Sequence, residues 1–262
     1  MTDGANTADA TIDHGRRAMS VPRRLMPVIM AVHAGENPKA IDSITELRHA
    51  GLMTSERLDP LVTSLVDVMI NPSLVVTVEV AGARSPRLAT IWGTPRRAVV
   101  GMTDDRRRFD LVQIEPKLLP FHLAQTTGLS PRPHPPFSGG CSLPATALNI
   151  AEDLIATDPE EAEKTLTAAG VPEPWADRLL TALTHRISLW TVESVWLGRG
   201  AGRSQSRLSV LDAGPAGYWR FAPDGDGTRV SITVSDFDDI IRRFSALLPT
   251  PGPPPGIGSI GN

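Results

Sequence analysis

The chain has 262 residues, with 26 Lys and Arg against 29 Asp and Glu and a net charge of −3. Its apolar content of 41% is that of an ordinary globular protein, and the charge balance argues against a general nucleic-acid or membrane surface. The single cysteine, Cys141, excludes an intrachain disulfide and suits a reducing compartment. No apolar stretch is long enough to cross a membrane, so a cytoplasmic protein is expected.

The first residues carry no helix or strand pattern. Residues 1–20 are small and polar and are predicted to form a disordered tail. The apolar run from Leu25 to Val32 is interrupted by Pro27 and lacks a clear cleavage site, so we expect no signal peptide.

A helical hairpin is predicted next. Its first helix ends near Gly51, because glycine adopts left-handed backbone angles at little cost. Its second helix carries a stripe of apolar residues typical of a core-facing helix, namely Leu58, Leu61, Val62, Leu65, Val68 and Met69. Four strands follow, near 74–80, 88–95, 97–101 and 111–114, and then a helix from Lys117 to Thr127.

Residues 130–144 are predicted to be a strap between two halves of the chain. Pro131 to Pro136 contains four prolines, which fix an extended backbone, and Ser138-Gly-Gly140 is loose. A ligand for a proline-binding module is an alternative interpretation of the same residues.

The second half repeats this order of elements. A helix ends near Gly170, and the next carries Trp175, Leu179 and Leu183 on one face. Strands are predicted near 188–196, 208–211, 218–221 and 231–234, followed by a helix over 236–248. Residues 250–262 are rich in Pro and Gly and are predicted to form a flexible tail.

The two halves align with each other. Residues 88–116 match 208–236 without a gap at an offset of 120, and Thr-Val-Glu occurs at both 77–79 and 191–193. Turn residues and apolar runs occur at equivalent positions throughout these aligned segments. This indicates an internal duplication, with repeats at about 25–130 and 150–249.

Short links between strands require antiparallel pairing, since parallel neighbours need a long crossover. We therefore predict an α/β protein of the α+β type with a pseudo-two-fold axis. A central antiparallel sheet would be flanked by two helical bundles within a single domain over 21–249.

The sequence offers no motif for catalysis, and we predict no catalytic residue, metal or cofactor. It lacks a phosphate loop, a Cys-x-x-Cys pair, His-Glu-x-x-His and Gly-x-Ser-x-Gly. Glu79 and Glu193 occupy equivalent positions and could form a carboxylate pair, but solvent-facing alternation along a strand also explains them.

Aromatic residues concentrate in the second set of strands, at Trp190, Trp196, Tyr218 and Trp219. They either form a binding face or fill a larger core. Alternation puts Tyr218 with Arg220 on one face and Trp219 with Phe221 on the other, so one pair is expected in the core. Replacing Tyr218 and Arg220 by alanine is expected to weaken partner binding without unfolding the protein.

Several features recur in a recognisable order: Glu46-Leu47 to Gly51-Leu52, Leu118-Leu119-Pro120, the strap leading into Cys141-Ser-Leu-Pro144-Ala, and Leu211-Asp212 through Pro215-Ala-Gly217 to Leu247-Leu248-Pro249. Together they resemble the EspG family of type VII secretion over residues 25–249. The resemblance implies a pseudo-two-fold fold with a central antiparallel sheet and two helical bundles.

It also implies a non-enzymatic cytosolic chaperone. Such a protein would bind the helical tip of a PPE protein within a PE–PPE heterodimer and keep it soluble for export. Contacts are then expected around the sheet and the second helical bundle. The candidate partner-binding residues are Arg84, Arg87, Trp175, Trp196, Arg207, Tyr218, Arg220 and Arg229.

One segment departs from the family pattern. Gly35 to Asp42 replaces a Gly-x-Thr stretch and a Glu-Arg helix start. Another helical-hairpin cargo, self-association of a monomer into a weak dimer, and an enzyme with a pocket between the halves therefore stay open as alternatives.

Overall fold

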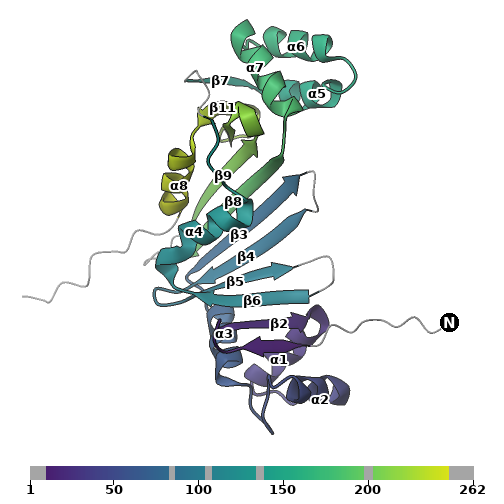
Figure 1. Ribbon diagram of the computed structural model, residues 1–262, viewed down its shortest axis with the longest axis vertical. Helices are drawn as coiled ribbons and strands as arrows, with labels where there is room; N and C mark the ends of the chain where they lie inside the picture. The colour runs from purple at the N-terminus through teal and green to yellow at the C-terminus, as the bar shows by residue number, and fades with distance from the viewer. Residues whose placement is uncertain (1–9, 83–85, 104–107, 134–138, 198–202, 248–262) are drawn as a thin grey trace, which may run out of the picture.

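The computed structural model describes residues 10–82, 86–103, 108–133, 139–197 and 203–247. Within these ranges eleven strands form one antiparallel sheet in the order β1-β2-β6-β5-β4-β3-β8-β9-β10-β11-β7 (Figure 1). The strands are β1 (Thr11–Asp13), β2 (Ala18–Pro22), β3 (Leu74–Gly82), β4 (Arg87–Gly93), β5 (Ala98–Thr103), β6 (Arg108–Ile114), β7 (Gly140–Pro144), β8 (Ser188–Leu197), β9 (Arg203–Asp212), β10 (Tyr218–Pro223) and β11 (Arg229–Ser235).

The helices divide into three groups. A first bundle contains α1 (Met26–His33), α2 (Ile41–His49) and α3 (Pro60–Ile70). A second bundle contains α5 (Ala145–Leu154), α6 (Pro159–Ala168) and α7 (Glu173–Thr184). Two single helices, α4 (Leu119–Thr127) and α8 (Phe237–Ala246), each follow the last strand of their half. The α+β prediction with one large antiparallel sheet and flanking helices is confirmed.

Local sequence explains where the helices begin. Asp59, Asp158 and Asp236 cap α3, α6 and α8 by accepting hydrogen bonds from backbone N–H groups of the first turn, at 2.8, 3.0 and 2.6 Å. The predicted stops at Gly51 and Gly170 are also found, and both glycines have positive φ.

The two halves join at the centre of the sheet. Strands β3 and β8 pair over their length, with Val78 opposite Val192. On either side of this pair Thr77 lies opposite Glu193 and Glu79 lies opposite Thr191. Outward from the centre, β3-β4-β5-β6 mirrors β8-β9-β10-β11. This order is compatible with a pseudo-two-fold axis, and the duplication itself stays a prediction.

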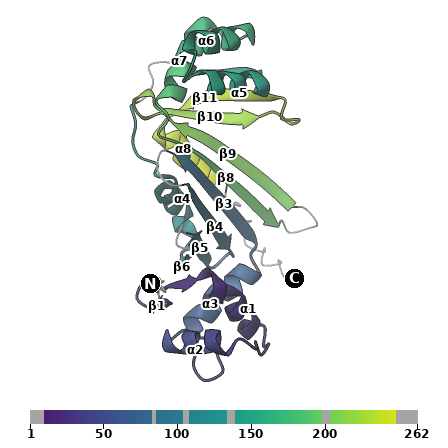
Figure 2. The same ribbon diagram turned by 90° about the vertical axis from the view of Figure 1, so that its right-hand side faces the viewer.

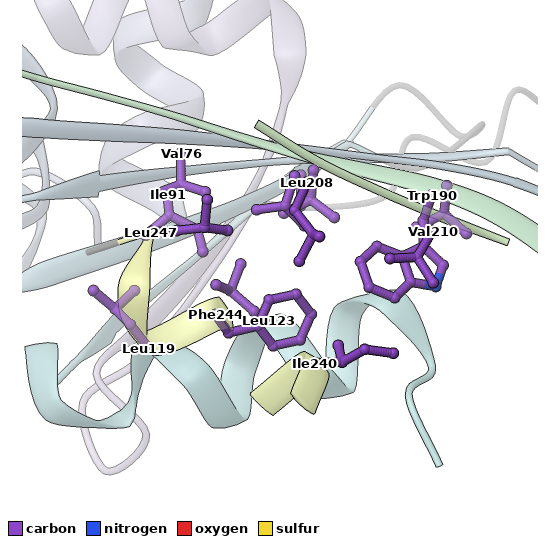
Figure 3. Packing of buried hydrophobic residues seen from close by; sticks show 14 of the residues in the cluster. Val76, Ile91, Leu119, Leu123, Trp190, Leu208, Val210, Ile240, Phe244 and Leu247 are labelled. Carbon is purple, nitrogen blue, oxygen red and sulfur yellow. The ribbon is translucent and has the colours of Figure 1, made fainter. Parts of the chain in front are cut away.

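One face of the sheet is covered by α4 and α8 (Figures 1 and 2). Figure 3 shows Leu119 and Leu123 of α4, with Ile240 and Phe244 of α8, packed against the sheet. The Phe244 ring lies 5.5 Å from Trp190, centroid to centroid. The sheet residues of this cluster include Val76, Val78, Val80, Ile91, Val192, Leu208 and Val210.

The opposite face is covered at its two ends. The first bundle buries Val99 and Leu111, and the second bundle buries Leu211, Trp219 and Ile232. Because side chains alternate between the faces, the strands near each end of the sheet bury residues on both sides.

Three sequence predictions need correction. Residues 11–20 are not a tail, because β2 pairs with β6 and buries Met19 and Val21. The end of the strap, Gly140–Pro144, is the edge strand β7, paired with β11. Helices α1 and α5 were not expected. The predictions for residues 1–9, 134–138 and 250–262 lie outside the described residues.

The contact between α8 and the sheet should dominate stability. We expect Phe244→Ala to lower the free energy of unfolding by about 3–5 kcal/mol, because it removes a fully buried ring and leaves a cavity. Arg242→Ala, on the exposed side of the same helix, should change it by less than about 0.5 kcal/mol. Urea denaturation followed by circular dichroism measures both, and equal effects would contradict this account of the core.

Candidate partner-binding surface

The middle of the sheet face between the two bundles carries side chains that are exposed or half-buried. On β3, for example, Val75, Thr77 and Glu79 point to this side, and the residues between them enter the α4–α8 core. We call this surface the open face. It consists of Val75, Thr77, Glu79, Leu88, Thr90, Thr103, Thr191, Glu193, Val195, Arg203, Gln205, Arg207 and Ser209.

Polar contacts organise one half of the open face. The Gln205 amide donates a hydrogen bond to the Glu193 carboxylate, and the hydroxyls of Thr191 and Ser209 lie 3.0 Å apart. Arg207 is the strand partner of Glu193, but no ion pair joins these two described residues. On the other half, Leu88 is the strand partner of Glu79 and is 47% exposed. The open face therefore combines methyl groups, hydroxyls and a few charges, a balance of apolar and polar groups that interfaces share with other protein surfaces.

A hollow of about 480 Å³ lies at one end of the open face. Its lining combines Glu79, Leu88 and Thr103 of the open face with two arginines, Arg23 and Arg87. Arg23 belongs to a short 3-10 helix (Arg23–Leu25) that leads into α1. Val80, Ala81 and Pro86 complete the lining.

The structure does not gather the eight predicted site residues on one surface. Arg207 lies on the open face. Arg87 is the strand partner of buried Val80 and points to the other side of the sheet, with its guanidinium near Gly128 at the end of α4. Trp196 points to the α8 side of the sheet and is half-buried there. Arg229 is exposed near the sheet edge, where it donates to the Ser142 carbonyl at 2.8 Å. Arg84 lies outside the described residues.

Trp175 is half-buried within the second bundle. Its ring makes an edge-on contact with Trp219 at a centroid distance of 5.8 Å. This contact places it in the packing between α7 and β10.

Tyr218 and Trp219 are each 1% exposed. The expectation that only one face of β10 enters the core is therefore wrong, because α8 covers one face and the second bundle covers the other. Arg220 points to the α8 side, where its Nε lies 2.5 Å from Ser235 Oγ and 3.4 Å from Asp239. Replacing Tyr218 and Arg220 together is accordingly expected to destabilise the fold, in contrast to the sequence-based expectation.

Sequence reasoning missed most of the open face. The alternation at residues 75–79 and 191–195 was visible, and Glu79 and Glu193 were noted as solvent-facing. Which stretch of the sheet stays uncovered depends on where the bundles pack, and strand alternation alone does not determine that.

Hydrogen bonds and an ion pair hold the start of the strap, Ser130 and Arg132, against the second half of the chain. The Tyr218 hydroxyl donates to the Ser130 carbonyl at 2.6 Å and accepts from the Ser130 N–H at 3.0 Å. Arg132 forms a two-point ion pair with buried Asp212, at 3.1 and 2.7 Å. Asp212 Oδ1 also accepts from the Gly214 N–H. Hydrogen bonding to Asp212 raises the pKa of Arg132, so the guanidinium stays charged.

Asp239 of α8 forms a second charged cluster with Arg220 and Arg243, on the side of the sheet that α8 covers. Burial opposes its ionisation, but hydrogen bonds from Arg243 and Ser235 and the charges of Arg243 and Arg220 outweigh burial and lower its pKa. Burial is also the first cause that lowers the pKa of Arg220, followed by repulsion from Arg243. The cluster anchors α8 to β10 and β11.

The described residues contain no group of three or more His, Cys, Asp or Glu side chains placed to hold a metal ion. In the same ranges, none of the helices combines the length and apolar character needed to span a bilayer.

The uncovered sheet face between the helical bundles is accessible to a partner. The EspG family model matches residues 36–243, which is most of the chain. The chain therefore belongs to the EspG family of type VII secretion chaperones, which are not enzymes.

A solved structure shares this fold: the Mycobacterium tuberculosis type VII secretion system chaperone EspG5 in complex with a PE25–PPE41 dimer. The TM-score is 0.64 at 12% sequence identity, and the match covers 88% of this chain and 95% of that chain. Comparison with curated protein sequences gave no match.

The ion pair between Arg132 and Asp212 gives a stability prediction. Arg132→Met should cost about 3 kcal/mol, because it leaves the Asp212 carboxylate buried without its cation. The double variant Arg132→Met/Asp212→Asn should recover part of that loss, since the amide carries no charge and can still accept from Gly214. Chemical denaturation of both variants tests this. A double variant less stable than Arg132→Met would rule out the charge-based explanation.

Asp239 gives a pH prediction. A lowered folded-state pKa contributes stability above the unfolded-state value of about 3.9, and this stability is lost as the pH falls through the folded pKa. Between about pH 5 and pH 2, Asp239→Asn should therefore lose less stability than the wild type. Thermal melts across this range measure the difference, and parallel curves would show that Asp239 does not contribute.

Proposed function

We propose that this chain is a cytosolic type VII secretion chaperone that binds the helical tip of a PPE protein within a PE–PPE heterodimer and keeps it soluble for export. The match of the EspG family model over residues 36–243 carries this proposal, because that range spans α2 and α3 of the first bundle, the whole second bundle and every strand of the open face.

The open face suits such a client. A helical tip exposes apolar side chains, and covering them prevents aggregation. Leu88 supplies apolar contact near the start of β4, and Val75 and Val195 supply it toward the opposite end of the strands. The two bundles flank this surface. In this proposal Arg207 acts at the rim, where charges set orientation more than affinity.

The other predicted contact residues fit this role less well. Trp175, Trp196 and Arg229 lie away from the open face, so they would touch a client only if the interface extends over the second bundle or the sheet edge. Tyr218 and Arg220 support the fold beneath the surface.

We further infer that the sheet arose by duplication of one half. The support is the ungapped alignment of 88–116 with 208–236 and the pairing of β3 with β8 about Val78 and Val192. A duplicated origin would explain why the open face carries matching Thr and Glu residues on its two central strands.

Co-expression with PE–PPE pairs from the same genome, followed by size-exclusion chromatography, tests the proposed function. We expect one peak that contains the chain and both subunits of one pair. A dimer of the chain without client would favour self-association. Recovery of a different helical-hairpin protein would favour another cargo, and the absence of any complex would contradict the proposal.

Two exposed apolar residues on adjacent strands give a matched test of the surface. Leu88→Asp should weaken client binding about tenfold or more, because it replaces an exposed apolar side chain of the open face by a charge. Met102→Asp is the control, since Met102 is 44% exposed but lies on the opposite side of the sheet, as the strand partner of Ala89. Calorimetric titration with the co-purified heterodimer measures both. Equal losses would argue against the open face.

A further inference from the structure

Helix α8 runs along strand β8 and directs the chain that follows it toward Trp196. The Phe244 ring lies 5.5 Å from the Trp190 ring, centroid to centroid. Three residues later, the Leu247 carbonyl accepts a hydrogen bond from the buried Ser194 hydroxyl at 2.8 Å. Figure 3 shows Phe244 and Leu247 in this order over the sheet. The chain therefore leaves the helix beside Ser194, and Trp196 is the next residue of β8 on the same face.

One flank of the Trp196 indole is covered and the other is open. The ring packs against the core cluster that contains Leu247, and its side chain is half-buried. Its two strand partners are Leu74 of β3 and Ser204 of β9. Leu74 is buried, whereas Ser204 is exposed and has a short side chain. Space is therefore left beside the ring on the β9 flank.

The indole N–H of Trp196 is also available. Among the described residues, the Trp196 Nε1–H makes no hydrogen bond. The same ranges contain no fully buried side-chain nitrogen or oxygen that lacks a partner, so this N–H can be reached from outside. A tryptophan with one accessible flank and an accessible N–H offers both an apolar surface and a donor.

The sequence that follows α8 has the matching chemistry. Residues 249–255, beyond the described ranges, are Pro-Thr-Pro-Gly-Pro-Pro-Pro, and we call them the proline segment. Proline fixes an extended backbone that has few N–H groups and exposes its carbonyls. Segments of this kind are recognised by aromatic side chains, on which the proline rings pack.

The distances also agree. Ser194 and Trp196 are separated by about 7 Å along β8, because each residue of a strand advances about 3.3 Å. A polyproline backbone advances about 3.1 Å per residue, so two or three residues beyond Leu247 cover this length. Pro249 is the second residue after Leu247 and Pro251 is the fourth, so the two prolines bracket the level of the indole.

We propose that the proline segment docks on Trp196 of its own chain. Pro249 and Pro251 pack on the open flank of the indole, above Ser204, and a carbonyl of the segment accepts the hydrogen bond from Trp196 Nε1–H. The docked segment extends the cover that α8 gives to β8 and shields the core where the helix ends. This site lies on the α8 side of the sheet, opposite the open face, so the inference does not rest on the proposed function.

The covalent connection favours this occupant over a segment from another molecule. A short tether gives an effective concentration on the order of millimolar. A separate chain at micromolar concentration therefore competes about a thousandfold less well for the same indole. The contact of two prolines with one indole is weak, but this advantage is enough to keep the segment docked.

Fluorine NMR of the full chain labelled with fluorotryptophan tests the proposal, with the Trp196 resonance assigned from Trp196→Phe. We expect Pro249→Ser/Pro251→Ser to shift this resonance and to increase the difference in its position between H2O and D2O, which reports contact with solvent. The resonance of Trp92 should stay in place, because Trp92 is half-buried against Phe109 on the opposite side of the sheet.

Gly256→Ser/Gly258→Ser is the matched control. It introduces two serines just after the proline segment and leaves every proline of the segment in place, so the Trp196 resonance should match the wild type. Both double variants should keep a cooperative melting transition, since the substituted residues follow Leu247, the last residue of the core cluster.

Three results would overturn the proposal. The first is a Trp196 resonance that is identical in the wild type and in Pro249→Ser/Pro251→Ser. The second is a wild-type resonance that moves on dilution, which would assign the docked segment to a second copy of the chain. The third is a resonance that ignores the proline substitutions and moves only when a PE–PPE heterodimer binds, which would assign the indole to the client.

Discussion

The antiparallel pairing of β3 with β8 is the interaction on which the rest of the structure depends. It joins the two halves backbone to backbone, with Val78 opposite Val192 at its centre. A hydrogen-bonded ladder of this length fixes register strongly where one face is buried, since a slip of one residue would turn Val76, Val78 and Val192 out of the core. The two helices α4 and α8 then meet over this seam and seal one side.

The proposed function rests on the unequal cover of the two faces of the sheet. Helices α4 and α8 occupy the centre of one face, whereas the bundles occupy only the ends of the other. The centre of that second face keeps the side chains of β3, β4, β8 and β9 accessible. A rigid sheet with raised ends is well suited to hold a helical tip, because little of it must reorder on binding.

Much of the fold was predictable from residue patterns. The eight strands of the two repeats, six helices and the stops at Gly51 and Gly170 follow from alternation, apolar stripes and glycine. Strands β1, β2 and β7 were missed because they are short, at 3, 5 and 5 residues, so alternation along them is hard to recognise. The contact surface was harder to predict. The sequence left open whether Tyr218 and Trp219 form a binding face or fill the core, and only the packing of helices on both faces shows that both are core residues.

Hydroxyl-radical footprinting of the chain with and without a bound PE–PPE heterodimer tests the central claim most directly, because it reports the exposure of individual side chains. If the client binds the open face, Leu88 should become protected, whereas Met102, similarly exposed but on the other side of the sheet, should react as before. Protection of Met102 with Leu88 unchanged would contradict the account.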